Sequence, residues 1–213
     1  MSVPSHLSVA RRRNPIQERG ERRVAALLDS AAAVIAKSGY EAATMSEIAG
    51  RAGASIGSLY QFFPNKESLA EELRAEYCRE LQLRWEPLKR DVQNLNLREL
   101  VDHLINIMVG FYEDHPAFLR LLDAPISPGR FSARLRFREQ LTDLFTQRKP
   151  RMPRQKAHRL AVVTQQIMRA LRVVYAESKP AERPYFVQEF KTLLLCYFRA
   201  RTKAPALEGR GLK

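Results

Sequence analysis

The chain has 213 residues, 45% of them hydrophobic and 28% charged, with 36 Lys and Arg against 23 Asp and Glu. This composition excludes a disordered chain and predicts a globular protein with at least one sizeable core. No run of about 18 uncharged apolar residues is present, so neither a membrane span nor a membrane partner is expected. Cys78 and Cys196 are too few for a disulfide framework and lack metal-ligand spacing. We expect both to be core thiols of a cytoplasmic protein, and we expect no metal site and no cofactor.

The first third of the chain predicts a short arm and three helices. Residues 1–17 are polar, basic and interrupted by proline, which is typical of a flexible arm. An apolar stripe at helical spacing follows and stops at Gly39. Thr44 and Glu47 then have the spacing of a capping box, and Ser55 is placed to cap the next helix. We therefore predict a domain at residues 18–64, with helices at 18–37, 44–52 and 55–63.

The rest of the chain also has helical periodicity, and Pro and Asn mark the boundaries. Asn65 is placed to cap a long helix that Pro87 should interrupt or kink. The predicted fold class is all-α, with about nine helices, a second domain at residues 65–203 and a frayed tail at 204–213. The helices of this second part are predicted at residues 66–90, 97–114, 116–123, 127–147, 155–178 and 182–203.

The segment from Thr44 to Lys66 has the pattern of a helix-turn-helix, two short helices joined by a tight turn that contains glycine. Leu59 and Phe63 are four residues apart and should bury the inner face of the second helix. The outward positions of that helix are then Ser55, Ile56, Ser58, Tyr60 and Gln61. Gly57 costs about 1 kcal/mol relative to Ala inside a helix, which suggests that a phosphate backbone or another helix approaches closely there.

The segment from Arg22 to Leu69 resembles the DNA-binding domain of the TetR family of transcriptional regulators. The resemblance is carried by Ser38-Gly39-Tyr40, by Thr44 to Ala49 and by Ala52 through Lys66. It implies a C-terminal domain that binds a small-molecule effector and forms a homodimer through the last two helices. It also implies phosphate contacts from Thr44, Tyr60 and Lys66, and a major-groove surface made of Ser55, Ile56, Ser58 and Gln61 beside Gly57. Phe62 departs from the Tyr or His frequent in the family, and Arg11, Arg12 and Arg13 are either groove contacts or a solvated tail.

The last two predicted helices each carry more than one apolar face. Leu160, Leu171 and Val174 mark one stripe of the first, and Phe186, Phe190 and Leu193 mark one stripe of the second. Helices of this kind need more than one neighbour. The second neighbour is either a partner subunit or another part of the same chain.

Large apolar or lone polar side chains on inward faces are the candidates for an effector pocket. The residues chosen on this ground are Trp85, His103, Met108, Phe111, Phe145, Gln166 and Arg169.

The positive charge is concentrated in residues 130–213, which hold 20 Lys and Arg against 6 Asp and Glu. One interpretation pairs the Arg130, Arg134 and Arg138 stripe with the Glu72, Glu76 and Glu80 stripe. The other is an anionic effector, such as an acyl-coenzyme or a carboxylate, attracted by residues 148–154.

The sequence therefore predicts a dimeric repressor that binds a palindromic operator in double-stranded DNA and responds to a small molecule. No Ser-His-Asp, Cys-His or phosphate-loop pattern is present, so an enzyme is not expected. The alternatives are an activator, and a DNA-binding protein controlled by a protein partner or by nothing.

Overall fold

The computed structural model describes residues 15–121, 128–148 and 151–202. These ranges contain nine helices and no strand, which confirms the predicted all-α class for this part of the chain. In chain order the helices are α1 (Pro15–Ser38), α2 (Met45–Arg51), α3 (Ile56–Phe62), α4 (Lys66–Asp91), α5 (Leu97–Asp114), α6 (Pro116–Arg120), α7 (Pro128–Gln147), α8 (Arg154–Glu177) and α9 (Arg183–Thr202). Among them, none combines the length and the apolar character needed to span a lipid bilayer.

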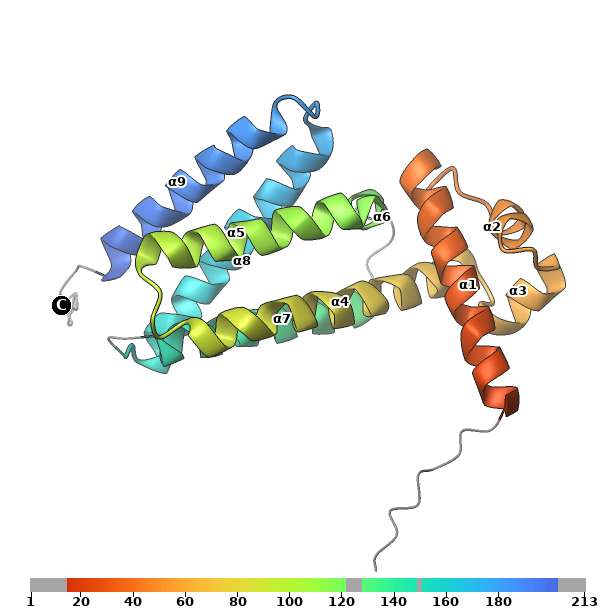
Figure 1. Ribbon diagram of the computed structural model, residues 1–213, viewed down its shortest axis with the longest axis horizontal. Helices are drawn as coiled ribbons and strands as arrows, with labels where there is room; N and C mark the ends of the chain where they lie inside the picture. Colours follow the sequence, from red (N-terminus) through yellow and green to blue (C-terminus); the bar gives the residue numbers. More distant parts are fainter. Residues whose placement is uncertain (1–14, 122–127, 149–150, 203–213) are drawn as a thin grey trace, which may run out of the picture.

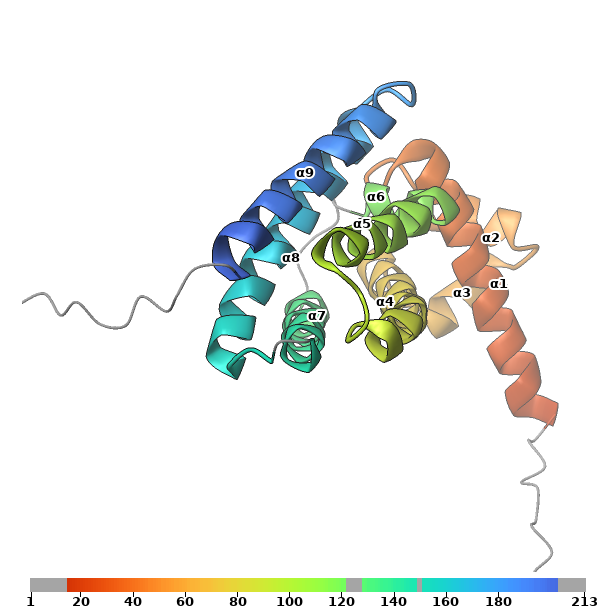
Figure 2. The same cartoon turned by 60° about the vertical axis from the view of Figure 1, so that its left-hand side comes forward.

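The head of the molecule consists of α1, α2 and α3, and the body consists of α4 to α9 (Figure 1). In the head, Leu27 and Ile35 of α1 pack with Ile48 of α2 and Leu59 of α3, and all four side chains are fully buried. Figure 1 shows α4 leaving the head and running along the whole body, while α8 and α9 lie at the opposite side from α3. The view in Figure 2 confirms this separation of α3 from the last two helices.

The helix boundaries agree with the capping residues seen in the sequence. Asn65 caps α4 by accepting from the Ser68 amide at 2.7 Å, and the Ser68 hydroxyl completes the reciprocal box. Thr44 caps α2 through the Glu47 amide at 3.2 Å. Pro87 does not interrupt α4, which continues to Asp91. The predicted helix at 116–123 is shorter than expected, because α6 ends at Arg120.

Parts of the predicted arm, tail and α7 start fall outside the described residues. The flexible arm was predicted at residues 1–17. Residues 15–17 belong to α1, and residues 1–14, which include Arg11, Arg12 and Arg13, are not described. Residues 122–127 and the predicted tail at 204–213 also lie outside the described residues. Cys196 is exposed and Cys78 is half-buried, so the expectation of two core thiols was wrong for Cys196.

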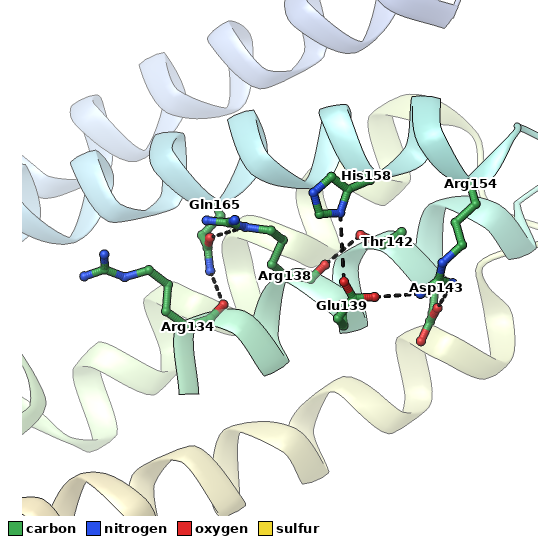
Figure 3. A network of polar contacts seen from close by, with 8 residues as sticks. All are labelled: Arg134, Arg138, Glu139, Thr142, Asp143, Arg154, His158 and Gln165. Atoms are coloured by element: carbon green, nitrogen blue, oxygen red, sulfur yellow. Dashed lines mark hydrogen bonds and ion pairs between the residues drawn. The ribbon is translucent and has the colours of Figure 1, made fainter. Parts of the chain in front are cut away.

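Helices α7 and α8 are antiparallel and are joined by a polar network (Figure 3). The Gln165 amide accepts from Arg138 Nε at 3.1 Å and donates to the Arg134 carbonyl at 2.8 Å. Further along, Arg154 donates to Asp143 at 2.7 Å and to Glu139 at 2.6 Å. These bonds fix the register of the two helices and so determine which of their side chains share a wall of the body.

The α2–α3 turn depends on Gly53, whose φ of +59° lies in the left-handed region. We expect Gly53→Ala to lower the free energy of unfolding by about 1 kcal/mol, because a Cβ is unfavourable at this φ. Gly50→Ala in the exposed interior of α2 is the control and should be neutral or stabilising. Urea denaturation followed by circular dichroism measures both, and equal stabilities of the two variants would contradict the argument.

Candidate nucleic-acid interface and internal cavity

The orientation of α3 is set by its two ends and by one buried residue. Ser55 Oγ accepts from the Ser58 amide at 3.2 Å and caps the start of the helix. Leu59 is the one buried residue within α3, and Phe63 is buried directly after it. With Leu59 and Phe63 turned into the head, the opposite side of the helix faces away from the protein.

The outer side of α3 carries the predicted contact residues. Ser55, Gly57 and Gln61 are exposed, and Ser58 is half-buried. Ile56 and Tyr60 retain 40% and 49% of their surface in contact with solvent. Phe62, which stands where Tyr or His is frequent in the family, is also 40% exposed and is not among the predicted contact residues. The result is a small protruding surface of short polar groups, one amide and three large apolar or aromatic side chains.

Thr44 and Lys66 flank this surface, and Lys66 already has partners in the protein. Its Nζ donates to the carbonyls of Tyr40 at 3.0 Å and Glu41 at 2.9 Å, and it lies 4.6 Å from the centre of the Tyr40 ring. An ammonium has three donors, so one stays available for a phosphate. Lys66 therefore ties the start of α4 to the turn after α1, a role that the sequence did not suggest.

The described part of the protein leaves free space where a side chain at position 57 would begin. A Cβ built there meets no heavy atom within 4 Å. Of the two explanations for this glycine, close approach of another helix is therefore excluded within the described chain. A partner outside the chain, such as a phosphate backbone, remains.

A cavity of about 290 Å³ lies within the body and is lined by residues of α4, α5, α6, α7 and α8. Its wall includes four of the seven predicted pocket residues, Trp85, Met108, Gln166 and Arg169. The other three lie elsewhere. His103 is exposed and its Nδ1 lies 2.8 Å from the Glu99 carbonyl. Phe111 and Phe145 are buried against other aromatic rings, at 5.9 Å from Tyr77 and 5.3 Å from Phe198 between ring centres.

The cavity wall also contains charged residues that the sequence analysis did not choose. They are Arg74 and Glu71 of α4, Arg134 and Arg136 of α7, and Arg172 of α8. These residues are far apart in the sequence, so the sequence alone does not indicate that they line one cavity. The only sequence signal was the excess of arginine in the C-terminal part of the chain.

One of the two earlier interpretations of this excess, the pairing of the two stripes, has to be corrected. Glu72 pairs with Arg79 on its own helix, and Glu80 pairs with Arg84 and His115, so these two carboxylates do not form a stripe with α7. In the 148–154 turn, Arg148 donates to the Leu95 carbonyl and Arg154 is bound by Glu139 and Asp143. Arg151 is exposed, and residues 149–150 lie outside the described part of the chain, so the anionic-effector interpretation stays a prediction. Among the described residues, Arg134, Arg136 and Arg169 form no ion pair with a carboxylate, and all three line the cavity.

Two family models match the chain. Residues 27–73 match the model for bacterial regulatory proteins of the tetR family, and residues 96–198 match the model for the tetracyclin repressor-like C-terminal domain. The HTH-type transcriptional repressor KstR of Mycobacterium tuberculosis is 41% identical over 54 residues, which is 25% of this chain and 24% of KstR. The match therefore spans about a quarter of the length of that curated relative.

Solved structures share the fold over most of the chain. A TetR-family transcriptional regulator from Streptomyces coelicolor superposes with a TM-score of 0.63 and 24% identity, covering 84% of this chain and 98% of that one. The transcriptional regulator FadR from Bacillus subtilis, in complex with stearoyl-CoA, gives a TM-score of 0.59 and 16% identity, covering 85% and 99%. Both show the same arrangement of a helix-turn-helix head on a helical body.

The variant Gly57→Ala tests separately what the glycine costs in folding stability and what it contributes to DNA binding. We expect the free energy of unfolding to rise by about 0.5–1 kcal/mol, because Ala is the better helix residue and has room. The dissociation constant for double-stranded DNA should rise several-fold, because the Cβ adds bulk to the outer surface. Gly110→Ala in α5, also without neighbours within 4 Å, is the matched control and should leave DNA binding unchanged. Denaturation and gel-shift titration measure the two effects, and an unchanged DNA affinity of Gly57→Ala would remove this explanation for the glycine.

Proposed function

The chain belongs to the TetR family of transcriptional regulators, and from this premise we propose that it is a repressor that binds a palindromic operator as a homodimer and is released by a small-molecule effector. The observation that carries the proposal is the outer face of α3. A seven-residue helix with one buried residue presents its remaining side chains to solvent at the tip of the head. This is the geometry in which a recognition helix enters the major groove.

The roles of the contact residues follow from their chemistry and exposure. Ser55, Ile56, Ser58 and Gln61 are assigned to the major groove, where Gln61 pairs with adenine N6 and N7 and Ile56 touches a thymine methyl. Thr44, Tyr60 and Lys66 are assigned to phosphates, which position the helix without reading sequence. The Lys66 ammonium also donates to the Tyr40 and Glu41 carbonyls. In this assignment the group that binds the phosphate is therefore the one that holds the start of α4 against the turn after α1.

The dimer is assigned to α8 and α9. Each helix buries one apolar side in its own body, including Leu171 of α8 and Leu194 of α9. On the outer side Leu193 is 52% exposed, Tyr185 is 65% exposed and Val173 is 36% exposed. Phe186 of α9 is half-buried and is not among the side chains packed against the core, so it adds to this outer apolar surface. Large exposed apolar groups on adjacent helices mark a protein interface.

Effector control is assigned to the cavity, because α4 connects it to the head. Glu71 and Arg74 line the cavity within three turns of Lys66, where α4 begins. A ligand that prefers one position of α4 therefore also selects a spacing of the two heads in a dimer. A coupling of about 1–3 kcal/mol is typical for such linkage. We assign the protein no catalytic step, and we place it in the cytoplasm, where the DNA is.

We expect replacement of Tyr60 to lower the affinity for all DNA, and replacement of Gln61 to change the sequence preference. Tyr60→Ala should weaken binding to every DNA by about fivefold, because a phosphate contact worth about 1 kcal/mol is lost regardless of sequence. Gln61→Ala should instead relax preference at one base pair, by about 1–3 kcal/mol. The operator is first selected from a random DNA pool, and gel-shift titrations then use its single-base variants. Unchanged binding and specificity in both variants would refute the α3 interface.

Leu193→Arg should convert the dimer to a monomer, because a charge would be buried in the apolar interface. The matched control is Leu83→Arg on α4, where Leu83 is 71% exposed and lies away from the proposed interface. Sedimentation equilibrium at matched concentrations measures the mass, and circular dichroism checks that both variants are folded. A wild-type monomer of 24.5 kDa, or a dimer that survives Leu193→Arg, would contradict the assignment.

A further inference from the structure

The charge of the cavity wall is strongly one-sided. Arginines from three helices line it, namely Arg74 of α4, Arg134 and Arg136 of α7, and Arg169 and Arg172 of α8, and a single carboxylate, Glu71, accompanies them. Within the described residues, no carboxylate forms an ion pair with Arg134, Arg136 or Arg169. Figure 3 shows the Arg134 guanidinium turned away from Glu139 and Asp143, which Arg154 occupies.

Cys78 of α4 lines the same cavity as these arginines. Burial raises the pKa of the Cys78 thiol, and the positive charges of Arg136, Arg79, Arg172 and Arg74 act in the opposite direction. Residues on three different helices thus lie within electrostatic range of one point on the cavity surface. Arg136 and Arg169 are exposed and Arg134 is half-buried, so these like charges lie on the solvent-facing side of the cavity, where together they attract an anion.

The same cavity has an apolar part. The Trp85 indole meets the Phe137 ring edge-on, with 5.4 Å between the ring centres, and both line the cavity. A ligand that touches both this apolar part and Arg134, Arg136 or Arg169 therefore has an anionic head and an apolar body.

The wall offers further donors without partners. The Trp85 indole N–H and the Tyr112 hydroxyl are buried and form no hydrogen bond within the described residues. Burial raises the pKa of Tyr112, so the phenol stays protonated and acts as a donor. Because both atoms have almost no accessible surface, the arginines are the charged donors that the cavity presents to a ligand.

We propose that the cavity binds a small amphipathic oxyanion, a carboxylate or a phosphate monoester with an aliphatic or aromatic body. Its volume of about 290 Å³ is at the lower limit of sites for small molecules, so the head group is a simple oxyanion and not a whole nucleotide coenzyme. A planar guanidinium binds such a head through two parallel hydrogen bonds. This inference rests on the proposed function only in treating the cavity as the effector site.

The single tryptophan makes the test direct, because Trp85 is the only one in the chain and it lines the cavity. Its fluorescence is titrated with four probes that share a ten-carbon chain, decanoate, monodecyl phosphate, 1-decanol and decyltrimethylammonium, each below its micelle concentration. We expect at least one of the two anions to bind at least tenfold more tightly than the alcohol and the ammonium. Equal or tighter binding of the alcohol or the ammonium, or no binding of any probe, would overturn the proposal.

Arginine variants show whether the head group is bound at this wall. The double variant Arg134→Gln and Arg169→Gln should raise the dissociation constant of the tighter anion about tenfold and leave that of 1-decanol unchanged. Arg159→Gln, an exposed α8 residue outside the cavity, is the control for loss of general positive charge. An equal loss in the control would assign the affinity to the overall charge and overturn the site.

A gel-shift assay with the same probes separates this proposal from effector control. If the anion binds at the cavity but the operator complex persists, the ligand class stands and effector release fails. If the operator is released by the alcohol as well as by the anion, release is independent of the oxyanion and the ligand class fails while effector control stands.

Discussion

The DNA-facing surface depends on the burial of Leu59. A helix of seven residues has almost no stability of its own in water, and within α3 only this side chain is withdrawn from solvent. Its contact with the α1 and α2 core sets the rotation of α3 about its axis, because rotating the helix would expose Leu59 and bury Ile56 or Tyr60 instead. The Ser55 cap and the buried Phe63 hold the two ends. Every assignment on the outer face follows from this one orientation.

Local signals explain why much of the fold could be predicted from the sequence. Asn65, Ser55 and Gly53 act within three or four residues of themselves, so their effects can be read from spacing alone. Contacts between distant segments could not be read in this way. The Lys66 bonds to Tyr40 and Glu41 span 26 and 25 residues, and nothing near Lys66 indicates them.

The cavity residues also show that contacts between distant segments cannot be predicted from local sequence signals. Phe111 and Trp85 are both large, aromatic and on inward faces, yet one faces other rings and the other faces the cavity. The difference arises from their neighbours across the body, because Phe111 packs against Tyr77 and Phe118 while Trp85 lies beside Phe137 of α7. The polar bonds between α7 and α8 help to place Phe137 and the arginines of that wall. Those bonds were not visible in the periodicity of either helix. The arginines were visible as a charge excess, but their meeting point was not.

The position of α6 shows how the cavity could act on the head. Phe118 of α6 lines the cavity beneath the Arg172 guanidinium, 5.3 Å from its ring centre, and α6 packs against α1. On the other side, His115 Nε2 lies 2.8 Å from Glu80 of α4, and Arg84 pairs with both Glu80 and Asp114.

Burial opposes the charged form of Glu80, but its hydrogen bonds to His115 and Arg84 outweigh this and lower the pKa of the carboxyl. Glu80 therefore stays ionised at neutral pH, and its contacts with His115 and Arg84 hold the start of α6 against α4 and α5. Phe118 and Arg172 therefore connect the cavity wall to a helix that also packs against α1. For the proposed effector, a coupling of about 1–3 kcal/mol then requires only that its contacts with these two side chains differ between two positions of the head.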